Sequence, residues 1–71
     1  MRKILIDGPI EIQQEGTGHW VISARVIPAW SIGGPGLIVE VVEGRDYNLD
    51  FAIMKLGMRI LYVDKSDAEV R

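Results

Sequence analysis

Short segments in which apolar and polar residues alternate run through much of the chain, and this alternation predicts β-strands. Between Trp20 and Pro28, the alternating positions Trp20, Ile22, Ala24 and Val26 are all apolar. A period of two residues is typical of a strand with one buried face. Glycine- and proline-rich turns separate this segment from its neighbours. The expected strands are residues 3–6, 10–13, 20–28, 37–42 and 58–63.

Residues 47–56 fit two periods at once. Their apolar residues alternate as in a strand, and the preceding residues 43–46 resemble a hairpin turn, so a sixth strand is the favoured interpretation. The alternative is a short helix over residues 49–56, with Asn48 as its N-cap and Gly57 just beyond its end.

These elements predict a mainly β fold, either a small antiparallel barrel of about five or six strands or a strongly bent sheet. Closure into a barrel would remove exposed strand edges. If residues 49–56 are helical, the fold becomes α+β. We expect a single domain over residues 1–64, followed by a charged, frayed tail at residues 65–71.

The chain has 71 residues, which is close to the lower limit for a domain that folds alone. A compact monomer of this mass exposes about 4,400 Å² of surface. The chain lacks cysteine and has one histidine, so neither disulfides nor a conventional zinc site is expected to stabilise it. Apolar residues make up 48% of the sequence. We therefore predict a homo-oligomer without metal or cofactor.

The net charge of −2 gives no broad attraction to phosphate, so we do not expect nucleic-acid binding. Arg2 and Lys3 resemble the start of a signal peptide, but Asp7, Gly8 and Pro9 interrupt the apolar stretch that a signal needs. No apolar run reaches the ~18 residues of a membrane span. The sequence predicts a soluble, cytoplasmic protein.

Catalytic motifs are lacking: no Ser-His-Asp set, Cys-His pair or HExxH spacing occurs. We therefore predict no enzymatic activity. The glycine-rich residues 31–36 do not match a phosphate-binding loop, because an apolar strand follows them and no lysine is present. They remain a candidate binding loop. The candidate contact residues are Trp30, Gly33, Gly34, Gly36, Arg25, Arg45, Arg59 and His19.

Trp30 has three interpretations: a core residue, an interface anchor or a stacking platform for a ligand. His19, which follows a tight turn, is either a polar residue at the start of a strand or a ligand contact. The function that fits best is a non-enzymatic module that self-associates and binds another protein, as an assembly component, adaptor or small inhibitor. The alternatives are a module for a small ligand or nucleotide, and a small barrel that binds single-stranded nucleic acid.

Overall fold

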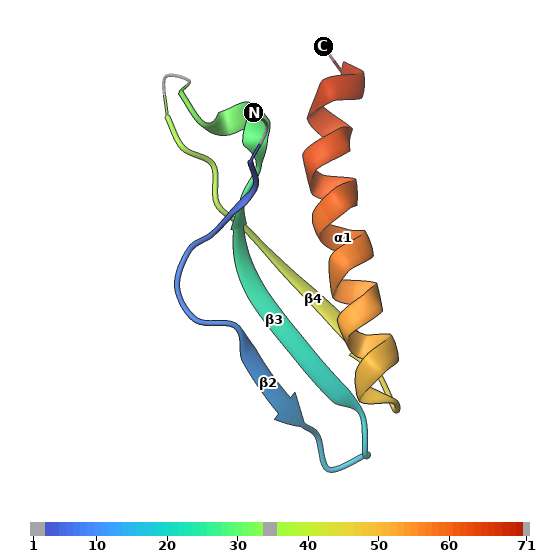
Figure 1. Ribbon diagram of the computed structural model, residues 1–71. Helices are drawn as coiled ribbons and strands as arrows, with labels where there is room; N and C mark the ends of the chain where they lie inside the picture. The colour runs from blue at the N-terminus through green and yellow to red at the C-terminus, as the bar shows by residue number, and fades with distance from the viewer. Residues whose placement is uncertain (1–2, 34–35, 71) are drawn as a thin grey trace.

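Strand β3 (Trp20–Ile27) is the centre of a four-stranded antiparallel sheet, and a long helix packs on one side of that sheet (Figure 1). The computed structural model describes residues 3–33 and 36–70. In chain order its elements are β1 (Leu5–Ile6), β2 (Glu11–Gln14), β3, the 3-10 helix η1 (Ala29–Ser31), β4 (Glu40–Asp46) and α1 (Leu49–Val70).

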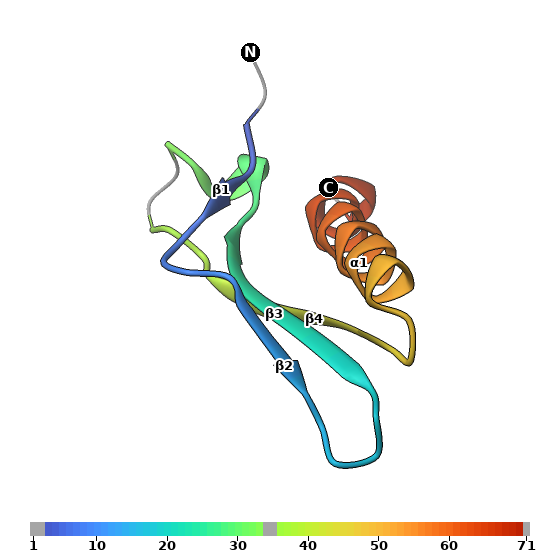
Figure 2. The same ribbon diagram turned by 60° about the horizontal axis from the view of Figure 1, so that its bottom comes forward.

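The two edges of the sheet differ in length. Strand β4 pairs with β3 over seven positions, from Trp20 opposite Asp46 to Val26 opposite Glu40. The short strands β1 and β2 also pair with β3, with Ile12 opposite Ile22 in β2. They must therefore lie end to end along the other edge. The sheet stays open, with β4 as one edge and β1 and β2 as the other (Figure 2).

Helix α1 begins immediately after β4 because Asn48 and Asp46 satisfy its first backbone groups. The Asn48 side-chain oxygen accepts a hydrogen bond from the Phe51 N–H at 3.2 Å. The Asn48 N–H in turn donates to the Asp46 carboxylate at 2.9 Å. These are the contacts of an N-cap. Asp50 lies in the first turn, where a negative charge is favourable.

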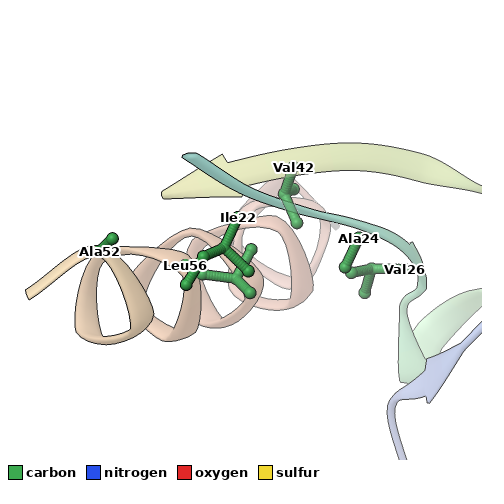
Figure 3. Close-up of a cluster of buried hydrophobic side chains, with 6 residues drawn as sticks. All are labelled: Ile22, Ala24, Val26, Val42, Ala52 and Leu56. Carbon is green, nitrogen blue, oxygen red and sulfur yellow. The ribbon is translucent and has the colours of Figure 1, made fainter. Parts of the chain in front are cut away.

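The core lies between α1 and the covered face of β3 and β4 (Figure 3). In β3 the predicted alternating positions Ile22, Ala24 and Val26 are buried, whereas Trp20 is only partly buried and Ile27, at the end of the strand, is buried as well. Opposite them, Ala52 and Leu56 point from α1 toward the sheet. Gly44 of β4 lies under this part of the helix so closely that an added Cβ would meet the Ala52 carbonyl oxygen and lie 2.5 Å from the Leu56 nitrogen. The six core residues are Ile22, Ala24, Val26, Val42, Ala52 and Leu56.

The C-terminal half of α1 is held by η1, the short helix that follows β3. The Ala29 N–H donates to the Asp64 carboxylate at 2.9 Å, and Asp64 is 5% exposed. The Trp30 indole N–H donates to the Val63 carbonyl oxygen at 3.3 Å. Helix α1 therefore starts beside the end of β4, reaches η1 with its C-terminal half and runs obliquely to β3 and β4 (Figure 1).

The α+β alternative is confirmed, and the barrel is wrong. Residues 47–56 and 58–63 do not form strands, because both belong to a 22-residue helix. Gly57 lies inside that helix rather than beyond its end. Residues 43–46 do not form a turn, because they are the second half of β4. The helix also includes residues 65–70, and the expected fraying of this tail stays a prediction.

Candidate functional site

An open groove runs between the outer edge of β4 and one flank of α1. Its volume is about 880 Å³. Residues of the strand line it on one side, and helix residues about one turn apart line it on the other. The lining residues are Glu40, Val41, Val42, Glu43, Arg45, Lys55, Met58, Arg59, Tyr62 and Val63. We call this feature the β4 groove.

The hydrogen-bonding direction of β4 follows from that of β3. On the edge that carries β1 and β2, the Arg25 carbonyl accepts from the Asp7 N–H, and the His19 carbonyl accepts from the Glu15 N–H, both at 2.8 Å. The odd-numbered residues of β3 therefore direct their backbone groups toward β1 and β2. The even-numbered residues direct theirs toward β4.

In the β3–β4 register, even-numbered residues of β3 lie opposite even-numbered residues of β4. The backbone N–H and C=O groups of these even-numbered residues of β4 are therefore hydrogen-bonded to β3. The odd-numbered residues, Val41, Glu43 and Arg45, direct their N–H and C=O groups away from the sheet. Among these groups, the Arg45 carbonyl accepts a hydrogen bond from the Lys55 side chain at 3.3 Å. The groove is thus bounded by a strand edge that can pair with another strand.

The part of the groove that Met58 and Tyr62 line is apolar and exposed. Tyr62 is 68% exposed and Met58 is 63% exposed, and both extend from the flank of α1 that lies over the β4 edge. Val41, on the edge itself, is 72% exposed; because it pairs with Arg25, its side chain points to the face of the sheet opposite α1. Exposed apolar side chains beside an unpaired strand edge are typical of protein-binding surfaces.

Charged side chains of both signs line the same groove. Lys55 contacts the Asp46 carboxylate at 2.8 Å, and Arg45 contacts Glu15 at 2.6 Å. The hydrogen bond from Lys55, together with that from the Asn48 backbone, holds the pKa of Asp46 below its ordinary value of 3.8.

Other groove charges are still available. Within the described residues, Arg59, Glu40 and Glu43 form no ion pair. A partner that brings charges of both signs could pair with all three of these side chains.

The structure brings two of the candidate contact residues together, because Arg45 and Arg59 both line the β4 groove. Arg25 lies on the face of the sheet opposite α1 and pairs with Asp7 at 3.2 Å. His19 is also elsewhere: its ring stacks on Tyr47 with 3.8 Å between centroids.

The other candidates lie near η1. Trp30 is half-buried and is hydrogen-bonded to the end of α1, which places it between two elements of the same chain. Gly33 and Gly36 are exposed, and Gly33 has a φ of 84°, which favours glycine. Gly34 lies outside the described residues. Gly33 and Gly36 do not line the β4 groove.

Sequence reasoning missed the groove residues Met58, Tyr62 and Val41. Met58 and Tyr62 are four residues apart, so they share one flank of a helix, but this relation is invisible if residues 58–63 are taken as a strand. Val41 lies in the expected strand at residues 37–42, in which every residue except Glu40 is apolar. That pattern predicts a strand covered by other chain segments, whereas β4 is an edge.

A second apolar surface lies at the other edge of the sheet, on β1 and β2. Ile12 is opposite the core residue Ile22, so it faces the same side of the sheet, yet it is 53% exposed. The reason is that α1 packs mainly against β4 and β3 and leaves this side of β2 uncovered. Ile6, opposite Val26, is also exposed on this side. We call Ile6 and Ile12 the isoleucine face.

Within residues 3–33 and 36–70, no cluster of three or more His, Cys, Asp or Glu side chains is arranged to hold a metal ion. No helix in that part of the chain combines the length and apolarity required to cross a membrane. Comparison with protein families, curated sequences and solved structures found no match for this chain.

Proposed function

We propose that this chain is a small non-enzymatic module that self-associates and binds another protein, as an assembly component, an adaptor or a small inhibitor. The observation that carries the proposal is the amount of surface that a single chain leaves exposed. The chain exposes 5147 Å², whereas about 4,400 Å² is expected for a compact monomer of its mass. The excess of about 700 Å² is close to the ~800 Å² that each partner buries in a standard protein interface.

The shape of the molecule explains the excess. The radius of gyration is 13.3 Å, whereas about 11 Å is expected for a compact chain of this length. The molecule is also elongated, with extents of 41 × 23 × 19 Å. A single helix cannot cover the whole sheet. Large apolar side chains therefore remain exposed on both flanks of the helix.

These exposed side chains are concentrated where a partner could cover them. Met58, Tyr62 and Val41 line the β4 groove, and Ile6 and Ile12 form the isoleucine face. Two separate surfaces support the two parts of the proposal, because one can serve self-association while the other stays available to a different protein. Single exposed apolar residues are normal in monomers, whereas apolar side chains that flank an unpaired strand edge are typical of protein-binding surfaces.

A small anionic ligand is the second candidate, because Arg45 and Arg59 line the same groove. Two features weigh against it. The apolar walls are exposed side chains, whereas ligand pockets usually bury most of the ligand. In addition, Glu40 and Glu43 offset the positive charge. A nucleotide and metabolite screen by thermal unfolding distinguishes the two candidates, because a true ligand raises Tm by mass action.

Native mass spectrometry of gently purified protein tests the proposal, since it counts subunits and weighs anything retained. The same sample sprayed from denaturing solvent gives the mass of the bare chain as a control. An oligomer, alone or with a second protein, is the expected result. A bare monomer at every concentration would contradict self-association, and an added mass of a few hundred daltons would favour the small-ligand candidate.

A further inference from the structure

The free edge of β4 is the longest exposed strand edge in the described structure, and it defines how a partner can bind. Val41, Glu43 and Arg45 offer outward-facing backbone groups along it. The opposite edge consists of the two-residue β1 and the four-residue β2. From the edge and its groove, we propose that a second copy of this chain pairs antiparallel with β4, about a twofold axis near Val42. This inference rests on the proposed self-association and deepens it.

The twofold geometry limits the register. A twofold axis perpendicular to the sheet puts both helices on the same side and pairs odd positions with odd positions. The axis cannot pass through Gly44, because α1 lies directly over that residue. Strands pair at ~5 Å, whereas two helix axes need about 8 Å or more. The axis must therefore lie nearer the start of β4, where the β4 groove opens between the strand and the flank of α1.

An axis at Val42 meets this requirement and uses the outward-facing groups. Val41 of one copy then lies opposite Glu43 of the other, and both residues direct their N–H and C=O groups toward the partner. The axis relates two such pairs, so each hydrogen bond is formed twice. The partner strand also lies below Met58 and Tyr62, which it would cover.

Charge complementarity favours a second copy as the occupant. In this register, Glu40 of one copy lies opposite Gly44 of the other. The basic flank of the partner's helix, with Lys55 and Arg59, lies above that position. Glu40 and Arg59 form no ion pair within the described part of the chain, and the twofold axis brings the pair together twice. The excess surface of about 700 Å² per chain matches the area that a stable dimer buries.

Analytical ultracentrifugation of a matched pair of proline variants tests this inference. Glu43→Pro removes an outward-facing N–H from the β4 edge and no hydrogen bond to β3. Gln14→Pro makes the same change on the opposite edge, because even-numbered residues of β2 face outward there and Gln14 is not part of the isoleucine face. Proline is tolerated on edge strands when the missing N–H faces solvent.

We expect a dimer for the wild type and for Gln14→Pro, and a rise of about tenfold or more in the dimer Kd for Glu43→Pro, because two hydrogen bonds per dimer are lost. A wild-type dimer that Glu43→Pro leaves intact would overturn the β4 interface while leaving self-association standing. A wild type that is monomeric at every concentration would overturn both.

A second pair of variants decides the question if either proline variant fails to fold, which circular dichroism detects. Tyr62→Lys places a charge on the groove flank of α1, and Leu61→Lys makes the same change at the neighbouring exposed residue outside the groove. Lysine is a good helix former, so both should fold. We expect Tyr62→Lys alone to raise the dimer Kd by about tenfold, because it must bury a charge. Equal Kd values for the two variants would refute the β4 interface.

Discussion

The contact between Gly44 and α1 gives the sharpest test of the fold. It is possible only because glycine has no Cβ atom. A Cβ on residue 44 would lie 2.5 Å from the Leu56 nitrogen and closer still to the Ala52 carbonyl oxygen. Both are backbone atoms of the helix and cannot rotate away. Normal contact between non-bonded heavy atoms needs about 3.5 Å, so the helix would have to withdraw by more than about 1 Å.

A withdrawal of that size weakens the packing of Ala52 and Leu56 on the sheet. A gap of about 0.5–1 Å forfeits a quarter to a half of the dispersion energy of each contact. Overpacking a core typically costs about 1–3 kcal/mol. We expect Gly44→Ala to reach the upper part of that range, about 2–3 kcal/mol. In a domain of this size, the corresponding loss in Tm is roughly 10–20 °C.

Thermal unfolding followed by circular dichroism measures this loss, and Gly57→Ala is the matched control. Gly57 lies within α1, and an added Cβ there has no heavy atom within 4 Å. Since alanine is favoured over glycine in a helix, Gly57→Ala should stabilise the protein by about 1 kcal/mol. The two identical substitutions thus have opposite expected signs. A Gly44→Ala protein with the Tm of the wild type would refute the close packing of α1 on β4.

Three further sets of variants test the helix anchor, the β4–α1 ion pair and the charges of the groove. Asp64→Ala should cost about 1–3 kcal/mol in urea unfolding, because it leaves the Ala29 N–H unpaired, whereas Asp64→Asn keeps an acceptor oxygen and should cost less. Asp46 has a lowered pKa, so its stabilising contribution is complete above its ordinary value of 3.8 and disappears as the pH falls through its lower folded pKa. Wild type should therefore lose its advantage over Asp46→Asn in thermal unfolding as the pH is lowered through that window; a constant difference in Tm would contradict the assignment. Glu40→Arg should weaken the dimer in sedimentation, and adding Arg59→Glu should restore it, because the swapped charges again meet across the axis; no restoration would argue against that contact.

The strands were predictable where alternation determines which face is buried. In β3, the period of two marks Ile22, Ala24 and Val26, which are buried, although it does not account for the buried Ile27 or the only partly buried Trp20. The N-cap was also predictable, since Asn48 precedes the helix that it caps. Both features depend on local sequence alone.

The length of α1 was not predicted because local signals conflict there. Gly57 marks the end of a helix in sequence, but it lies inside α1 and costs only about 1 kcal/mol relative to alanine. Tertiary packing offsets that cost, because Leu56, Ile60 and Val63 continue the buried stripe on both sides of the glycine. Following this period of three and four residues past Gly57 would have identified the whole helix.

Gly44 led to the opposite error, because a turn was predicted where the structure has a continuous strand. Its neighbours have the composition of a turn, yet it lies in mid-strand because the helix backbone packs directly on it. The β4 groove depends on this contact and on the length of α1. For that reason only Arg45 and Arg59 among its residues were expected as contacts, and their proximity was not.

Amide hydrogen exchange, measured residue by residue at high and low protein concentration, tests the β4 interface most directly. In the dimer, the Val41 and Glu43 amides are hydrogen-bonded to the partner strand, so they should exchange slowly at high concentration and rapidly on dilution. The amides of Ile12 and Gln14, which face outward on the opposite edge, should exchange rapidly at both concentrations. Rapid exchange of Val41 and Glu43 at a concentration where the protein is dimeric would contradict the pairing of β4 with a second copy.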